Sequence, residues 1–488
     1  MITRTNSSLN GRPSFQVRRS GLFSKSTAST LKLDELIFCM FIVLCGCAVL
    51  PLVKKMGLPS VMTSNAMVLL FLGFITYVLR HGLNFVLFSL TRQYLLLTIL
   101  LCLISIVMSF WLYPTVSAIS GETTIDTCIV TLCWLIFDVV VLVYFSNVFA
   151  TIDLVYLDRS YEVLTALVML FGFCQAAVIL GIPGSRNLYR VLDFSGWLSN
   201  FLDQGAERLT GVTSEPAAMG KILVMMCLPF HISKANDSNS GWHKAAIVLL
   251  VVLGYFTKAT TVYIALLFFF VYLSQLWLFS NKKNKATVAL FFGAMCILMV
   301  LVLIWLIGGS KLIGSQFSET LERVFRKATD TSNSSTAYRF STVYNDLAVF
   351  RDYPIFGVGE GSQGFFYAQN VPAWVVSSSS VGAAMALNGT GSVVNGGSFL
   401  PALISGYGIV GSFAFLLWVY ASIRYAIRNK ETMGSYFEMY CLSLAASIPL
   451  LIIGIGFSGF QAVLYLTLSM PFIAARTETA AGLEVYKR

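Results

Sequence analysis

Apolar runs of transmembrane length fill most of this chain. Taking runs of about 17–25 residues as membrane spans, the pattern predicts twelve transmembrane helices. They lie near residues 35–53, 61–79, 94–117, 125–148, 161–182, 214–232, 244–257, 259–280, 286–308, 398–423, 436–454 and 457–475. The seventh run is short, which suggests a tilted or broken helix. The sequence therefore predicts an all-α, polytopic membrane protein.

Two long polar segments interrupt these runs. The first spans residues 183–213, and the second, much larger one spans 309–397. The chain is therefore expected to divide into a disordered cytoplasmic tail (1–33), nine spans that include the first loop (34–308), the large loop (309–397), three further spans (398–475) and a second tail (476–488). Water-facing chemistry is expected in the two loops.

The distribution of Lys and Arg predicts which side of the membrane each loop faces. The chain is 57 % hydrophobic and 11 % charged, with a formal net charge of +10. Twenty of its 33 Lys and Arg residues fall in tails and short loops on the side of the N-terminus. Because basic residues are in excess on the cytoplasmic side of a membrane, both termini are expected inside and both long loops outside. This distribution also explains the net charge without nucleic-acid binding.

Several kinds of chemistry are excluded by residue type. All ten cysteines fall within the apolar runs, so neither a disulfide framework nor a paired-cysteine metal site is expected. The three histidines, at positions 81, 231 and 243, lie on the cytoplasmic side, which excludes a histidine base or metal site on the outer face. No nucleotide-binding or metalloprotease motif is present. No metal and no cofactor is therefore predicted.

Both loops contain amphipathic stretches. Residues 193–211 predict a helix lying in the membrane interface, with Phe194, Trp197 and Phe201 on its apolar face. In the large loop, a first amphipathic stretch (316–328) precedes a second helix over 337–351. That second helix carries Arg339, Thr342 and Asp346 on one side, ends before Pro354, and is followed by a Ser/Gly-rich segment (377–398).

The stretch TGVTSEPAAMGK (210–221) is a helix start. Thr213 or Ser214 is expected to cap it, and Pro216 suits its first turn. Glu215 then lies at the outer mouth of the sixth span, where a carboxylate is either a simple helix starter or functional. Lys221, deeper in the span, is its candidate partner or a phosphate ligand.

The large loop supplies further candidates for anion binding. Arg339 and Arg351 could bind phosphate through their forked guanidinium groups, or they could snorkel or contact lipid headgroups. Glu360 lies in the sequence GVGEG (357–361), which is either an anion-binding concavity or a plain turn. An ATP site is excluded because the loop faces away from the cytoplasm.

The turn FTKATT (256–261) offers one cation and two hydroxyls at the expected level of Glu215. These are Lys258, Thr260 and Thr261, and a plain turn is the alternative. Asp126 and Asp138 lie in the fourth span. A carboxylate near mid-membrane is costly unless it is paired or protonated, and no role is predicted for Asp138.

The order of these motifs resembles a known family. TSEP opens a membrane helix, T-x-x-T-T starts a later one, and the large loop reads R-x-S-x-x-Y-N-D-x-x-x-x-F-x-x-x-P-I-x-G-V-G. Together, over residues 160–475, they resemble the bacterial O-antigen polymerase (Wzy) group of the O-antigen polymerase/ligase superfamily. The resemblance implies a membrane fold like that of C-type glycosyltransferases.

The resemblance also implies a reaction. A polymerase transfers a growing glycan from undecaprenyl pyrophosphate to a lipid-linked repeat unit at the outer face of the inner membrane. Arg339 matches the family's loop arginine and is assigned to the pyrophosphate, and Glu215 is assigned to base or acceptor-positioning work. The lower-ranked phosphate or sugar ligands are Arg208, Lys221, Lys258, Thr260, Arg351 and Glu360. The implied partners are the lipid-linked oligosaccharide, the bilayer and a chain-length regulator protein.

Two other functions are weighed against this one. Ligases of the superfamily, which move the glycan to the lipid A core, carry a functional histidine in the large loop, and residues 309–397 contain none. A flippase should show repeated halves and a polar central cavity, whereas this chain gathers its polar groups at one face. The sequence therefore favours a polymerase.

Overall fold

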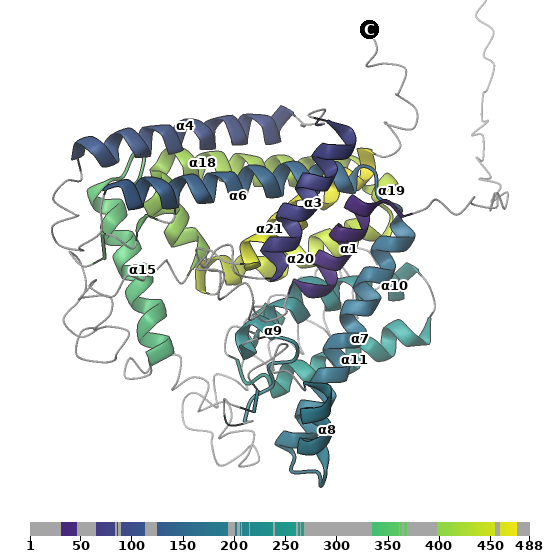
Figure 1. The fold of residues 1–488 in the computed structure, drawn as a ribbon. Coiled ribbons are helices and arrows are strands. Elements are labelled where there is room, and N and C mark those ends of the chain that lie inside the picture. The colour runs from purple at the N-terminus through teal and green to yellow at the C-terminus, as the bar shows by residue number, and fades with distance from the viewer. Residues whose placement is uncertain are drawn as a thin grey trace, which may run out of the picture.

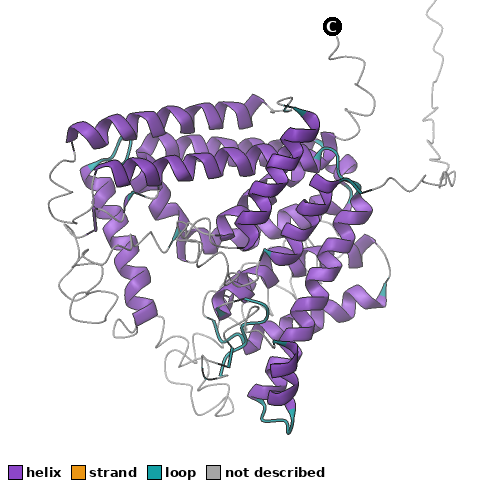
Figure 2. Ribbon diagram, in the orientation of Figure 1, coloured by secondary structure: helices purple, strands orange, loops and turns teal. Residues whose placement is uncertain are grey.

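Most of the residues that the computed structural model describes lie in helices (Figure 1). The described residues are 31–45, 65–82, 85, 89–112, 124–193, 201–202, 205, 207–213, 215–237, 240–259, 262–263, 265–267, 334–360, 362–363, 366–367, 398–453 and 459–475. Every regular element within these ranges is a helix (Figure 2). The predicted all-α class is thereby confirmed.

The helices follow one another along the chain in the order given by their residue numbers. The first half contains α1 (Leu33–Leu44), α3 (Asn65–His81), α4 (Ser89–Leu112), α6 (Thr124–Phe149), α7 (Leu154–Ile179), α8 (Ser185–Leu192), α9 (Pro216–Ile222), η2 (Leu223–Cys227), α10 (Leu228–Asp237) and α11 (Gly241–Phe256). The second half contains α15 (Ser334–Asp352), α18 (Phe399–Arg428), α19 (Lys430–Met433), α20 (Ser435–Ile453), α21 (Gly459–Ser469) and η5 (Met470–Ala474).

The helices coincide with the apolar runs. Four of those described are long and apolar enough to cross a membrane, at residues 131–149, 154–179, 216–235 and 399–428. Five shorter apolar helices accompany them. The chain is therefore a membrane protein. The predicted span 286–308 and most of 259–280 lie outside the described residues, so the number of twelve spans stays a prediction.

Aromatic side chains fill the space between the helices. Phe38 of α1 packs edge-on against Tyr144, Phe145 and Phe149 of α6, with ring centroids 5.2–6.0 Å apart. Tyr94 of α4 stacks on Trp418 of α18 at 5.0 Å. Such pairs each contribute about 0.5–1.5 kcal/mol beyond the burial of their area. The Phe38 pairs join α1 to α6, and the Tyr94–Trp418 pair joins an N-terminal helix to a C-terminal one.

Two ion pairs lie at helix ends that were predicted to be cytoplasmic. Arg80 at the end of α3 bonds Asp34 at the start of α1, with 2.8 Å between Nη1 and Oδ1. Lys234 of α10 bonds Asp158 of α7 at 2.7 Å, and the Tyr436 hydroxyl of α20 donates to the same carboxylate. Each pair joins helices that are separate in sequence.

Two helices have local breaks that hydropathy does not reveal. The sixth predicted span contains a π-helical turn, η2, between α9 and α10. Helix α18 is interrupted at Gly408, whose backbone angles are φ 62° and ψ −160°. Because an L side chain rarely adopts this conformation, glycine is required there. The break matters for the site, as described below.

The interfacial helix expected over 193–211 lies largely outside the described residues, so it stays a prediction. The helix in this loop is α8, which ends at Leu192, and the described residues among 193–211 are not helical. Phe201 is buried and packs edge-on against Tyr189 of α8 at 5.1 Å. At this described residue the apolar side chain therefore contacts α8.

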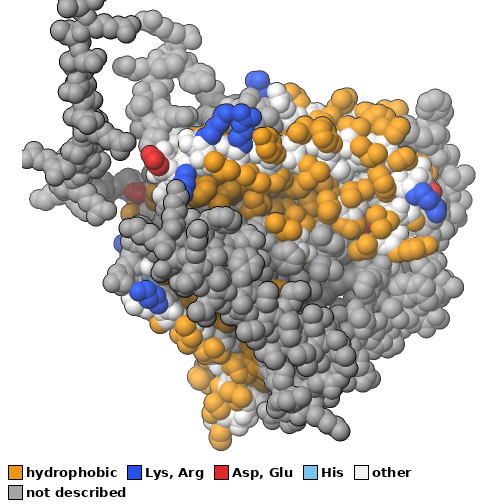
Figure 3. Space-filling model, turned by 180° about the vertical axis from the view of Figure 1, so that it is seen from behind, with side chains coloured by type: hydrophobic (Ala, Val, Ile, Leu, Met, Phe, Trp, Pro, Cys, Tyr) orange, Lys and Arg blue, Asp and Glu red, His pale blue; other side chains and the backbone are white. Residues whose placement is uncertain are grey.

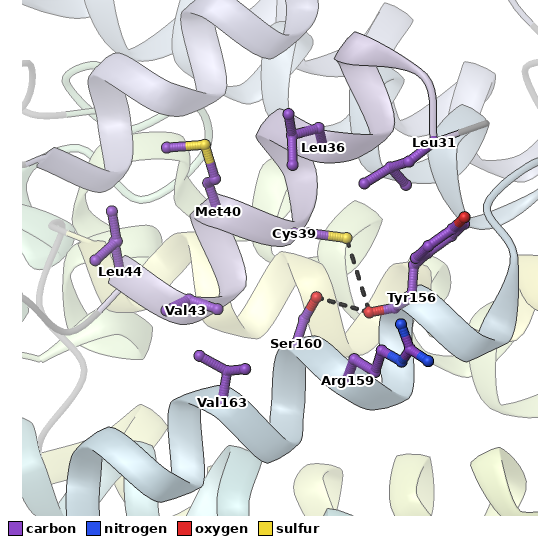
Figure 4. A pocket seen from close by; sticks show the side chains of 10 residues that line it. All are labelled: Leu31, Leu36, Cys39, Met40, Val43, Leu44, Tyr156, Arg159, Ser160 and Val163. Atoms are coloured by element: carbon purple, nitrogen blue, oxygen red, sulfur yellow. Dashed lines mark hydrogen bonds between the residues drawn. The ribbon is translucent and has the colours of Figure 1, made fainter.

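The outer surface of the bundle is strongly apolar. Figure 3 shows hydrophobic side chains gathered in a broad band on the face opposite to that of Figure 1. On α18 the exposed apolar residues are Ile409, Phe413, Leu416, Leu417, Tyr420 and Ile427. An apolar cavity of about 410 Å³ lies between α1 and α7, with Arg159 among its lining residues (Figure 4). It contains none of the predicted site residues.

Candidate functional site

A buried glutamine shapes the loop that precedes Glu215. Gln175 of α7 is fully buried, and its Oε1 accepts hydrogen bonds from the backbone amides of Thr210 (2.9 Å) and Gly211 (2.7 Å). Its Nε2 donates to the Gly211 carbonyl at 2.9 Å. Because buried backbone groups need partners, this single side chain fixes the conformation of the loop. The sequence analysis did not single it out.

Glu215 occupies the N-cap position of α9, with Pro216 following at the first helical residue. Its side chain is exposed and makes no capping hydrogen bond. The Thr213 hydroxyl donates to the Glu215 carbonyl at 2.7 Å, which fixes the backbone before the helix. Glu215 is therefore exposed at a helix N-terminus. The N-cap is Glu215 itself, and not Thr213 or Ser214 as the sequence predicted, because the Thr213 hydroxyl donates to the carbonyls of Thr210 and Glu215.

Arg208, in the segment before α9, is brought together with Lys258, in the turn after α11. The Arg208 guanidinium donates to the carbonyls of Thr257 (3.3 Å) and Lys258 (3.1 Å), and the Leu209 amide donates to Phe256. Lys258 has a φ of 48°, the one positive φ among non-glycine residues in the described part of the chain. Strained backbone of this kind gathers at functional sites.

Helix α9 also approaches the segment that follows Lys258. A Cβ added at Gly220 would overlap the side chain of Val262. The glycine therefore allows α9 to contact this segment closely. We call Arg208, Glu215, Lys221 and Lys258 the α9 group, since all four lie on α9 or on segments beside it. Thr260 and Thr261 lie outside the described residues.

Helix α15 presents a buried polar face. Ser341, Thr342, Asn345 and Asp346 are all fully buried. The Asp346 Oδ1 accepts hydrogen bonds from the hydroxyls of Tyr367 (2.7 Å) and Ser405 (2.9 Å), which ties α15 to α18. Burial raises the pKa of Asp346 to about 7, although the two hydrogen bonds act in the opposite direction. Arg339 lies on the same helix, three residues before Thr342, and its side chain is outside the described part.

The loop after α15 fills the break in α18. The amides of Val358 and Gly359 donate to the carbonyls of Ser405 (3.0 Å) and Gly406 (2.8 Å). In return, the amides of Ile409 and Val410 donate to the carbonyls of residues 354 (2.9 Å) and 355 (3.3 Å). The glycine-rich motif therefore supplies the hydrogen bonds that the interrupted helix lacks.

This pairing explains a glycine of the motif. Gly357 has a φ of 67°, and a Cβ placed on it would overlap the backbone of Gly406. The amides of Val358 and Gly359, which an anion cradle would need, are occupied by carbonyls of α18. The structure therefore favours the plain structural interpretation of these glycines over the anion-binding one.

Glu360 points into the bundle. It is 1 % exposed and accepts a hydrogen bond from the Tyr407 hydroxyl at 2.7 Å. The Gln461 Nε2 lies 3.0 Å from Glu360 Oε1 and 3.1 Å from Asp138 Oδ1. Glu360 thus contacts α18 and α21 rather than the α9 group, and its carboxylate does not reach solvent. Arg351, by contrast, is exposed and pairs with Asp352 at 3.0 Å.

The predicted site residues that the structure describes therefore fall into the α9 group, Arg339 on α15, and two residues that lie apart from both. Arg208, Glu215, Lys221 and Lys258 belong to the α9 group, and Arg339 lies on α15. Glu360 is buried elsewhere, and Arg351 is bound to its neighbour in sequence. Sequence reasoning missed Gln175 and Gln461, two amides inside apolar helices. A polar side chain in a membrane span is the signal that could have found them.

Comparison with known proteins identifies the segment that carries most of these residues. Residues 245–384 match the family model Wzy_C, described as O-Antigen ligase. The matched segment includes Lys258, α15 with Arg339, Arg351 and Glu360. The resemblance to the O-antigen polymerase/ligase superfamily is thereby confirmed. No curated protein matches the chain significantly.

Proposed function

We propose that this chain, a membrane protein with an O-antigen ligase-like segment, is an O-antigen polymerase. It joins undecaprenyl-pyrophosphate-linked repeat units into a polysaccharide at the periplasmic face of the inner membrane. The observation that carries the choice of polymerase over ligase is the composition of the large loop. Residues 309–397 contain no histidine, whereas ligases of the superfamily use one there.

The reaction needs a charged leaving group to be stabilised. A hydroxyl oxygen of the acceptor sugar attacks the anomeric carbon of the donor glycan, and the bond between that carbon and the pyrophosphate oxygen breaks. Negative charge develops on the departing undecaprenyl pyrophosphate. Cations held in place beforehand lower the barrier most, because they need no reorganisation during the reaction. Arg339 is assigned this role, with Lys258 and Arg208 as supporting cations.

The attacking hydroxyl also loses a proton. Glu215 is the candidate to accept it or to orient the acceptor. Its position supports this role, because it is exposed at the N-terminus of α9. The remaining predicted ligands, Lys221, Thr260 and Arg351, stay proposals for contacts to phosphate or sugar. Glu360 is given a different role below.

Ligation is the second candidate function, because the matching family model is described as a ligase. A gene deletion in a bacterium that makes capped lipopolysaccharide separates the two. Loss of a polymerase leaves the lipid A core carrying single repeat units, so the gel ladder disappears and one short band remains. Loss of a ligase or a flippase leaves uncapped core, and uncapped core would refute the proposal.

A further inference from the structure

Two acids meet where the loop after α15 enters the bundle. Asp138 of α6 and Glu360 of the loop are both essentially unexposed, and one nitrogen, Gln461 Nε2, lies within hydrogen-bond distance of an oxygen of each carboxyl group. Neither acid takes part in any ion pair among the described residues. A buried carboxylate without a cation is costly. The pair therefore needs another means of limiting its charge.

The surrounding groups are neutral hydrogen-bonding side chains. Gln461 and Tyr465 of α21, Tyr407 of α18 and Tyr94 of α4 face the two acids. Gln461 Nε2 bonds an oxygen of each acid, and the Tyr407 hydroxyl donates to Glu360 Oε2. These contacts satisfy carboxyl oxygens, but none of them supplies positive charge.

The two acids bind the same amide nitrogen, so they lie close to each other in a site that holds no cation among the described residues. Two like charges this close inside a low-dielectric site disfavour ionisation of both. The pair of Asp138 and Glu360 therefore keeps one proton between its two carboxyl groups. While the proton is bound, the pair joins α6 to the loop. When the proton leaves, the same two groups repel each other.

We propose that Asp138 and Glu360 share one proton and act as positioning residues, holding α15 and the loop that follows it against α18. We call these described residues, 334–360, 362–363 and 366–367, the α15 arm. The inference rests on the proposed function only in that the arm carries Arg339. Asp138 and Glu360 act on the reaction through the arm, without contacting the substrate.

Other contacts hold the arm as well, and one of them titrates. Asp346 is the other buried acid whose contacts tie the arm to α18, and burial raises its pKa to about 7. A raised folded-state pKa means that its contribution to docking is lost as pH rises through about 7. The substitution Asp346→Asn keeps the oxygen that accepts from Tyr367 and Ser405 but does not ionise. Every protein in the test, including the parent, therefore carries Asp346→Asn.

The test is hydrogen exchange of the purified protein in detergent, between pH 6 and pH 10. The readout is the protection factor of the Val358 and Gly359 amides, corrected for intrinsic exchange. With the acid pair intact, protection should fall by about tenfold per pH unit while the docked pair keeps a proton that the released arm has lost, and it should level off once the docked pair also ionises. Glu360→Gln and Asp138→Asn each replace the shared proton with an amide donor, so their profiles should stay flat to within about twofold.

The matched control is Asp158→Asn, which removes a carboxylate that Lys234 and Tyr436 bind elsewhere in the bundle. It should keep the pH dependence of the arm. If Glu360→Gln or Asp138→Asn retained that dependence, or if the parent profile were flat, the inference would be overturned. The exchange experiment needs no substrate. In a separate elongation assay, failure of the parent protein and of every variant would count against the polymerase proposal. The exchange experiment alone would still decide whether Asp138 and Glu360 share a proton.

Discussion

Replacing Arg339 with alanine is expected to abolish chain extension while leaving the protein in the membrane. Removing one group that stabilises transition-state charge typically slows a reaction by about 10²- to 10³-fold. Arg339→Lys should recover only part of the activity, because an ammonium lacks the forked geometry that binds phosphate bidentately. The measurement is the lipopolysaccharide ladder of a deletion strain complemented with each variant.

The control for Arg339 is Arg186→Ala on α8, an exposed arginine outside both parts of the candidate site. It should support wild-type ladders. Immunoblots of membrane fractions must show equal amounts of all three variants. Full ladders from Arg339→Ala would remove Arg339 from the mechanism, even if the chain remained a polymerase.

Replacing Gly357 with valine should disconnect the α15 arm from α18 and stop chain extension. The left-handed backbone at this position disfavours a side chain by about 1–2 kcal/mol, and the new Cβ would also overlap the backbone of Gly406. Both effects weaken the hydrogen bonds between the loop and the break in α18. The measurements are the ladder and the exchange protection of Val358 and Gly359.

A substitution at a second glycine separates the effect of backbone strain from that of overlap with neighbouring atoms. Gly181 also has a positive φ, of 71°, but no atom lies within 4 Å of its added Cβ. Gly181→Val therefore carries similar backbone strain at an open position, and it should keep both chain extension and arm protection. If both valine variants behaved alike, the contact with Gly406 would not be what positions the arm.

The helices were predictable because the membrane imposes a simple length rule. The fourth predicted span, 125–148, is observed as Thr124–Phe149, and the loop helix predicted over 337–351 is observed as Ser334–Asp352. Run length and Pro354 sufficed for these boundaries. The helix predicted from periodicity over 193–211 lies largely outside the described residues, and an apolar face suits contact with another helix as well as with lipid.

The site was predictable only where its residues are close in sequence. The proline rule correctly places Pro216 in the first turn of α9, whereas the capping rule placed the N-cap at Thr213 or Ser214 instead of Glu215. By contrast, the amide that donates a hydrogen bond to Asp138 belongs to Gln461, which is 323 positions away in the chain. The pairing of the GVG motif with the break in α18 likewise depends on the tertiary fold. Hydropathy signalled that Asp138 needed a partner, but it could not identify one.

The measurement that tests the central claim most directly is elongation by the purified protein in liposomes. The vesicles would contain undecaprenyl-pyrophosphate-linked repeat units from a polymerase-deficient strain, with no lipid A core and no nucleotide sugar. Gel analysis after incubation should show a ladder of lipid-linked products that are multiples of the repeat unit, and Arg339→Ala should give none. If products formed only when lipid A core was added, each carrying a single transferred glycan, the chain would be a ligase and the account would be contradicted.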